Sequence, residues 1–357
     1  MGLIAITVLL SNTKGLKFYC MLDNSKCVIE DWNPSMDGYF LFQHIPNDTT
    51  SIHFINLQSL HIVSELCTIL ARCVDSLIIE HSPKVTMLHL PSTCNILVVT
   101  LQDTGLQFLN FEQNESLASV IVKNSRIGII PATIANLPNI EYVTLDNTDV
   151  EVVDLHLFYP FRHLKLLQIR YAKVRYVRGT SATIGRCPLD SLKLDHNFLR
   201  IVNLNLFAPF ASLTMLNLAY NRIEVLTGRL SNPILNSLLL NSNRLKVLDL
   251  CPWNVLHHLN AFTIAYNNIQ RMPLCLHRFR NVTHASMQFN QINSIEVEQL
   301  IHLSNLVSIN VSFNNISSIP VNESLYPPKL RQIDLCGNPI SNDTITDRMI
   351  GSIDVML

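Results

Sequence analysis

Apolar residues recur along most of this chain with one fixed spacing. From Leu213, the segment LTMLNLAYNRIEVL places apolar side chains at positions 1, 4, 6, 11 and 14 of a unit, with an asparagine at position 9. The same frame fits units that start at Leu189, Leu235, Leu259, Val282, Leu306 and Leu330. Positions 3 to 7 alternate as a short strand does, so side chains 4 and 6 are expected to face a core and side chains 3, 5 and 7 to face outward. Each unit therefore predicts one strand followed by a return segment.

This spacing is the leucine-rich repeat pattern L-x-x-L-x-L-x-x-N-x-L. Upstream it continues in a degraded form, in units that start at Thr49, Val74, Ile96, Leu117, Ile140 and Leu164. The mean period is about 23 residues, inside the range of about 20–29 for this repeat class. One unit cannot bury its apolar face alone, so stability must come from stacked neighbours. We predict an α/β solenoid, a leucine-rich-repeat horseshoe with a parallel sheet on the concave face and irregular or short helical returns on the convex face.

The asparagine at position 9 is expected to be buried, since it follows the strand on the core side. A buried amide must be hydrogen-bonded, and the nearest partners are backbone groups of its own turn and of neighbouring turns. The predicted structural ladder comprises Asn197, Asn221, Asn243, Asn267, Asn290, Asn314 and Asn338. On the return side, Phe158, Phe207 and Phe279 are expected to cap the core.

The ends of the chain are predicted to differ from the repeats. Residues 1–15 carry a short apolar run and small residues and are interpreted as a signal peptide, although no basic residue precedes Leu10. Residues 16–48 are interpreted as an N-terminal cap, residues 49–340 as about thirteen repeat units, and residues 341–357 as a tail without a cysteine cap. Ile345, Met349, Ile350 and Ile353 are expected to cover the last core. No apolar run reaches the roughly 18–20 residues of a membrane span.

Sequons and cysteines favour an extracellular chain. Nine cysteines accompany seven Asn-x-Ser/Thr sequons, at Asn47, Asn114, Asn281, Asn310, Asn315, Asn322 and Asn342. Five of the seven sequons lie beyond residue 280. Asn310 falls at the outward position 5, so a glycan there would obstruct the carboxyl-terminal part of the concave face. Partner contact on that face is therefore expected in the middle units.

Cysteine spacing predicts three disulfides. Cys20 and Cys27 are expected to close a small loop over the open end of the core, and Cys67 and Cys73 to form a second pair. Cys251 and Cys275 both occupy position 17 of successive units; they either form a disulfide between turns or are buried small hydrophobic residues.

The number of cysteines is odd, so at least one thiol lacks an internal partner. Cys336 lies at the outward position 7 of the last clear unit. It either forms an intermolecular disulfide or remains a thiol outside any disulfide. Cys94 and Cys187 are expected in the core.

The sequence offers no catalytic motif and no metal or cofactor motif. It contains no CxxC, GxSxG, HExxH, phosphate-binding loop or dinucleotide fingerprint. The formal net charge of −1 gives no overall field that would favour nucleic acid. We therefore expect a protein that is not an enzyme and binds no cofactor, metal or nucleic acid.

The surface expected to bind a partner is the concave face of the middle units. Its outward positions are joined by an aromatic or imidazole stripe at position 8, and such residues suit protein recognition. They could instead simply cover the bend between strand and return. The candidate contact residues are Tyr142, Asp146, Arg170, Tyr171, Lys193, Asp195, His196, Asn217, Tyr220, Leu239 and Tyr266, and Phe289 and Phe313 continue the stripe.

The early FYC and KC segments at Cys20 and Cys27, the degraded first unit TTSIHFINLQSLHIV and endings such as NVSFNNISSIP carry a family resemblance. Over about residues 16–340 the chain most resembles the secreted leucine-rich immune proteins of mosquitoes. The resemblance implies a haemolymph protein that binds complement-like thioester proteins, or another leucine-rich-repeat protein, in defence against parasites or bacteria. Those proteins continue into a cysteine cluster and a coiled coil. Here no cysteine and no heptads follow Asn338, so the chain resembles a short form without the coiled coil.

These features together predict a secreted, non-enzymatic protein-binding protein, with a role in innate immune recognition or scaffolding. Two alternatives remain. One is the ectodomain of a membrane receptor or adhesion protein, and the other is a cytosolic repeat adaptor.

Overall fold

The structure is a computed structural model that describes residues 15–21, 23, 25–62, 66, 69–70, 74–180, 187–340 and 349–357. The chain divides into two compact units. Unit 1 comprises residues 1–153 and 160–173, and unit 2 comprises residues 154–159 and 174–357.

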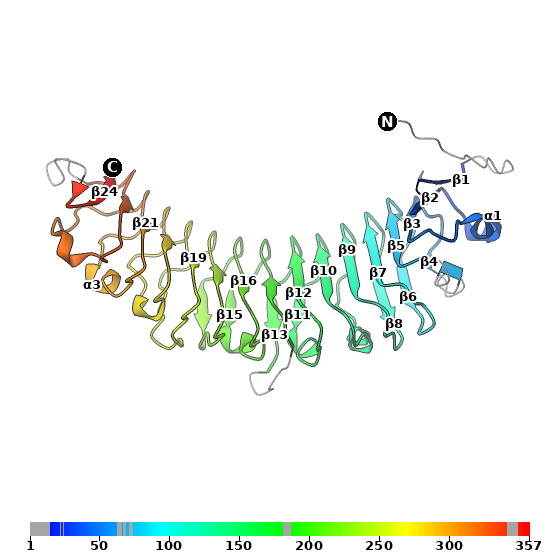
Figure 1. The fold of residues 1–357 in the computed structure, drawn as a ribbon, viewed down its shortest axis with the longest axis horizontal. Coiled ribbons are helices and arrows are strands. Elements are labelled where there is room, and N and C mark those ends of the chain that lie inside the picture. Colours follow the sequence, from blue (N-terminus) through cyan, green and yellow to red (C-terminus); the bar gives the residue numbers. More distant parts are fainter. Residues whose placement is uncertain are drawn as a thin grey trace. The chain divides into compact units, whose positions relative to one another are not determined.

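Unit 1 contains a sheet with one strand from each turn, and its strands follow one another in chain order (Figure 1). The strand β1 pairs antiparallel with β2, and every later neighbour within this unit is parallel. The strands are β1 (Lys17–Cys20), β2 (Lys26–Glu30), β3 (Ser51–Ile55), β5 (Ser76–Glu80), β7 (Val98–Gln102), β9 (Ser119–Lys123), β10 (Tyr142–Asp146) and β12 (Leu166–Arg170).

Unit 2 repeats the same arrangement with shorter strands. They are β14 (Ser191–Lys193), β16 (Met215–Asn217), β18 (Ser237–Leu239), β19 (Ala261–Thr263), β20 (His284–Ser286), β21 (Ser308–Asn310), β22 (Gln332–Asp334) and β24 (Ile353–Met356), with β23 (Met349–Ile350) antiparallel to β24. Position 4 of each turn pairs with position 4 of the next, as Leu192 does with Leu216 and Leu216 with Leu238. These side chains are fully buried, which confirms the predicted frame and the leucine-rich-repeat solenoid.

The return segments are more regular than the sequence suggested. Short helices are present, as expected: η2 (Ala132–Asn136), η3 (Leu155–Leu157), η4 (Leu204–Phe207), η5 (Leu276–Arg278), α3 (Val297–Leu300) and η6 (Glu323–Leu325). Other returns form strands. In unit 1 a parallel sheet is formed by β4 (His61–Ile62), β6 (Met87–Leu90) and β8 (Phe108–Phe111). In unit 2 a parallel pair is formed by β15 (Ile201–Asn203) and β17 (Val225–Thr227). Further return strands are β11 (Val152–Asp154) and β13 (Tyr176–Arg178). Alternate burial along β6 and β8 is the strand pattern that the sequence reading missed.

The position-9 asparagines form the predicted ladder. In unit 2, Asn221 Nδ2 donates to the carbonyl of Leu194 in the preceding turn at 2.9 Å and to Leu218 in its own turn at 3.1 Å. Its Oδ1 accepts from the Leu199 backbone N–H at 3.1 Å. The same bonding recurs through Asn338. One buried amide thus satisfies backbone groups of two turns at once.

In unit 1 hydroxyl and apolar side chains replace this asparagine. Ser82 Oγ accepts from the Leu57 N–H at 2.9 Å and donates to the Glu80 carbonyl at 2.7 Å. Thr104 and Ser125 share a hydrogen bond of 2.8 Å. A hydroxyl is too short to reach as many groups as an amide, so these turns depend more on the longer main-sheet strands for backbone pairing.

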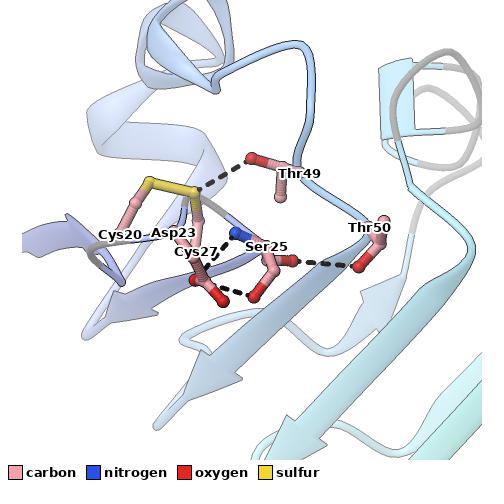
Figure 2. Close-up of a disulfide and its surroundings, with 6 residues drawn as sticks. All are labelled: Cys20, Asp23, Ser25, Cys27, Thr49 and Thr50. Carbon is pink, nitrogen blue, oxygen red and sulfur yellow. Dashed lines mark hydrogen bonds between the residues drawn. A yellow bond between two sulfur atoms is a disulfide. The ribbon is translucent and has the colours of Figure 1, made fainter.

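The amino-terminal turn of unit 1 is shown in Figure 2. A disulfide joins Cys20 and Cys27, which face each other across the β1–β2 hairpin, and Cys27 is fully buried. Thr50 Oγ1 donates to the Ser25 carbonyl at 3.1 Å, which ties the next turn to this one. The antiparallel β1 thereby occupies the edge of the parallel sheet, a position that would otherwise expose unpaired backbone groups.

The cap also contains a repeat turn of its own. The strand β2 pairs in register with β3, and Trp32 follows it at position 9, buried and stacked on Phe54 at 5.4 Å. The frame therefore extends one turn closer to the amino terminus than the residue pattern indicated, because an indole in place of asparagine hides it.

The carboxyl-terminal segment adds a further strand, and one residue expected to cover the last core, Met349, does not do so. The strand β24 pairs in parallel with β22 and continues the sheet, with Val355 buried at position 4 of a further turn. Ile350 and Ile353 are buried as expected, whereas Met349 is 45% exposed and does not cover the core. Ile345 lies outside the described residues.

The asparagine ladder makes a stability prediction. Asn243→Ala leaves the buried Ile223 N–H without its partner and removes one of the two amide donors from each of the Leu218 and Leu240 carbonyls. We expect a loss of about 2–4 kcal/mol in the free energy of unfolding of unit 2. Urea unfolding followed by Trp253 fluorescence, with Trp32 replaced by Phe, measures it, because Trp253 is the tryptophan of this unit.

The matched control is Asn241→Ala, two residues away, whose half-exposed side chain is expected to contribute less than about 0.5 kcal/mol. Equal unfolding midpoints for the two variants would show that the amide does not hold the turns together.

Candidate functional site

The residue at position 8 takes a left-handed conformation in every turn from Asp31 to Phe313, with φ between 47° and 58°. Its N–H donates to the position-7 carbonyl of the following turn, as Tyr220 does to Asn241 at 2.9 Å and Phe313 to Cys336 at 2.7 Å. The chain bends here so that position 9 can enter the core, and side chain 8 is left outside. We call the row of these side chains the position-8 ridge.

In unit 1 the position-8 ridge is mainly polar. Asn124 Nδ2 donates to Asp103 Oδ1 at 2.7 Å, and Asn147 Nδ2 donates to Asn124 Oδ1 at 2.9 Å. His81 lies 3.2 Å from Asp103. Asparagine and aspartate tolerate the left-handed region, so backbone preference explains their presence.

In unit 2 the same ridge is aromatic. Rings stack between successive turns: His196 on Tyr220 at 4.2 Å, Tyr266 on Phe289 at 4.4 Å, and Phe289 on Phe313 at 4.4 Å. Tyr220, Tyr266 and Phe313 nevertheless remain half exposed, at 50–52%.

These rings are not explained by backbone preference or by burial. A left-handed residue other than glycine costs roughly 1–2 kcal/mol, and a stacked ring pair recovers about 0.5–1.5 kcal/mol. Asparagine, which unit 1 uses at this position, would avoid the cost. An exposed aromatic row held in a disfavoured conformation points to a binding role.

The structure places most of the predicted contact residues on one surface in each unit. In unit 1, Tyr142 is 40% exposed beneath Lys165, and Arg170 lies over the Tyr171 ring at 5.2 Å. In unit 2, Lys193, Asn217 and Leu239 occupy position 5 of successive paired strands and are half-buried.

Asp195 is a correction. It is only 2% exposed, and its carboxylate accepts from Asn217 Nδ2 at 3.0 Å and lies 2.8 Å from His196 Nδ1. Position 7 in this turn is closed by its neighbours, so Asp195 orients the two residues beside it instead of meeting a partner.

Asp146 is a half-buried carboxylate on the sheet face of unit 1. Burial raises the pKa of Asp146, while a 2.8 Å hydrogen bond from Gln168 and the charges of Arg170 and Lys123 lower it in part. Among the described residues, nothing hydrogen-bonds to its Oδ1, and that oxygen is buried. A buried carboxylate oxygen without a hydrogen-bond partner costs stability, and it is closed to a binding partner in this conformation.

The sequons differ in accessibility. Asn47, Asn281, Asn315 and Asn322 are exposed, Asn310 is half-buried, and Asn342 lies outside the described residues.

The expected glycan at Asn114 is wrong for the folded protein. Asn114 is 1% exposed; its Nδ2 donates to the Pro91 and Cys94 carbonyls, and its Oδ1 accepts from the Ser116 and Leu117 N–H groups. It is a structural asparagine.

The cysteines agree with most of the expected arrangement. Cys251 and Cys275 form a disulfide between successive turns, with a Cα separation of 5.1 Å. Cys67 and Cys73 lie outside the described residues. Cys94 and Cys187 are buried, and burial raises the pKa of Cys187 to about 12, which keeps its thiol protonated. Cys336 is half-buried after β22, and its pairing between chains stays a prediction.

Within the described ranges, no three His, Cys, Asp or Glu side chains gather as metal ligands would. In those same ranges, no helix has both the length and the apolar character needed to cross a bilayer.

Comparison with known proteins agrees with the fold. The model of the family described as "Leucine rich repeat" matches residues 280–340. A comparison with curated proteins finds no match.

Three solved structures are similar over most of this chain. A leucine-rich-repeat protein of Leptospira interrogans is 17% identical with a TM-score of 0.56, over 87% of this chain and 90% of its own. The mosquito LRIM1/APL1C complex gives 16% identity and a TM-score of 0.62, over 90% of this chain and 55% of the matched one. The APL1 leucine-rich repeat domain is 15% identical with a TM-score of 0.57, over 88% of this chain and 77% of its own. At these identities the similarity establishes the leucine-rich-repeat fold.

Asp146 makes a pH-dependent prediction. Because its folded-state pKa is raised, the ionised carboxylate destabilises the fold, fully above that pKa, and the penalty disappears below the unfolded-state pKa. Asp146→Asn should therefore stabilise unit 1 by about 0.5–1 kcal/mol near about pH 7, and the gain should vanish near about pH 3.

Thermal unfolding of both proteins across that pH range measures this difference. Asp149→Asn is the control, since Asp149 is an exposed partner of Lys173 at 2.7 Å. If the stabilisation by Asp146→Asn grew toward acid pH, the pKa of Asp146 would be lowered by folding, which would contradict this prediction.

Proposed function

We propose that this chain is a secreted, non-enzymatic recognition protein that binds a protein partner through the sheet face and the position-8 ridge. The observation that carries the proposal is the row of stacked, exposed rings at Tyr266, Phe289 and Phe313, held in a left-handed conformation. Aromatic side chains supply contact area at low entropic cost and dominate many protein interfaces.

An extracellular location is part of the proposal. Two disulfides and four exposed sequons support it, because disulfides persist in oxidising compartments.

An innate immune role is the finer part of the proposal. It is supported by the sequence resemblance to the secreted leucine-rich immune proteins of mosquitoes and by the similarity of the fold to the mosquito LRIM1/APL1C complex. The partner class that this resemblance suggests is a complement-like thioester protein.

Expression of the full chain in insect cells tests the location. Mass spectrometry of the medium, with and without glycosidase and reductant, should find glycan at exposed Asn281, Asn315 and Asn322, none at Asn114, and the Cys20–Cys27 and Cys251–Cys275 linkages. Retention in the cytosol, reduced and without glycan, would remove the secreted assignment.

Binding is tested with a ridge variant. Tyr266→Asn, Phe289→Asn and Phe313→Asn together install the residue that unit 1 uses at Asn56, Asn124 and Asn147, so the fold should be kept. Binding to a purified mosquito complement-like thioester protein, measured by biolayer interferometry, should weaken at least about tenfold.

The control is Ser242→Asn, which introduces the same residue at the non-aromatic turn between Tyr220 and Tyr266 and should bind like wild type. Equal affinity of ridge variant and wild type would refute a role for the ridge. Absence of binding by the wild type would refute this partner class.

A further inference from the structure

A second surface of unit 2 lies beyond the position-8 ridge, on the flank where positions 10, 12 and 13 begin the return. A hollow of about 650 Å³ in unit 1 is lined by polar side chains of both charges, including Asp103, Arg126 and Asp149. The hollow of about 610 Å³ in unit 2 differs: it is lined by Arg175, Tyr176, Phe198, Arg200, Ile201 and Arg222. It has three guanidinium groups and no carboxylate.

A second hollow of about 400 Å³ continues this flank along the next turns. Its lining includes Arg244, Lys246 and Val225, and Glu224 supplies its single carboxylate. Glu224 lies 3.9 Å from Arg244, and both side chains are about half exposed, so the pair neutralises little of the local field. We call the two hollows together the flank strip. Five cations face one anion there, in a chain whose net charge is only −1.

Exposed apolar side chains alternate with these cations. Tyr176, Ile201, Val225 and Val247 occupy position 13 of four successive turns and are 47–65% exposed. Ile201 and Val225 face each other across the β15–β17 pair. Isolated exposed apolar residues are ordinary, but a continuous row beside a cationic row marks an interaction surface.

The apolar row of the flank strip ends at Val247. In the next two turns position 13 carries Arg271 and Ser294, and positions 10 and 12 carry the uncharged residues Asn268, Gln270, Gln291 and Asn293. The strip thus covers four turns. At about 4.8 Å between adjacent strands it is about 14 Å long, which matches four or five residues of an extended peptide.

We propose that the flank strip binds a short acidic segment of a partner protein, in which carboxylates alternate with apolar side chains. This inference rests on the proposed protein-binding function and adds the chemistry of the segment recognised. Guanidinium groups pair with carboxylates in a bidentate manner, and the row at position 13 takes up the alternate side chains.

Nucleic acid fits this surface less well. Bases need flat aromatic faces for stacking, and the Arg222 guanidinium already covers the Phe198 ring at 4.4 Å. Apart from Tyr176, the residues of the apolar row are aliphatic. A purely anionic polysaccharide would make no apolar contact with that row, which would stay exposed to solvent.

The test is a fluorescence anisotropy titration of the full chain with a labelled ten-residue peptide that alternates glutamate with leucine. Arg200→Glu combined with Arg222→Glu should weaken peptide binding about tenfold or more. Arg280→Glu, an exposed charge reversal of the same unit outside the strip, should change it less than about twofold. A peptide with glutamine in place of glutamate should bind at least about tenfold more weakly, and added salt should weaken the acidic peptide.

Three results would overturn the inference: equal binding of the glutamine peptide, equal binding by the Arg200→Glu, Arg222→Glu variant, or tighter binding of heparin or a uridine ten-mer than of the peptide. The same variant is also measured against the thioester protein. If only the ridge variant loses that partner, the flank strip inference fails while the proposed function stands. If the wild type binds no thioester protein, the proposal of that partner class is refuted. The peptide titration then still tests whether the flank strip binds an acidic segment.

Discussion

The burial of the position-9 side chain is the constraint on which the fold depends, and in unit 2 the amide of an asparagine meets it. That amide joins the carbonyl and N–H groups of two turns, as Asn243 does for Leu218, Leu240 and Ile223. For that side chain to enter the core, the backbone must bend at the end of the strand. The preceding residue is then left-handed and outside. The buried ladder and the exposed ridge are therefore two consequences of one constraint.

This constraint also separates the surfaces that could bind partners. Positions 3, 5 and 7 lie on the sheet face, position 8 forms the ridge, and positions 10, 12 and 13 form the flank. Unit 1 uses the ridge for an Asp–Asn hydrogen-bonded row, as between Asp103 and Asn124. Unit 2 uses it for stacked rings, as between Phe289 and Phe313. The same backbone bend thus presents a polar surface in unit 1 and an aromatic surface in unit 2.

The sequence was enough to predict the solenoid, the strand positions and the ladder, because leucines and asparagines at fixed spacing are forced by burial. It failed where a different residue meets the same need, as with Trp32 at position 9, and where the return forms strands such as β6 and β8. It also could not reveal that Asp195 and Asn114 are buried, since their polar character suggests exposure while their partners come from neighbouring turns. The flank strip was missed because its cations lie about 23 residues apart in the chain.

Hydrogen–deuterium exchange at single-residue resolution tests the central claim most directly. The N–H groups of Leu199, Ile223, Leu245, Ile269 and Ile292 bind asparagine side chains and no strand partner. If the amide ladder holds the turns together, these N–H groups should exchange as slowly as those of the paired strands β16 and β18. Exchange as fast as in the exposed return loops would contradict the account, because the turns would then be held by the sheet alone.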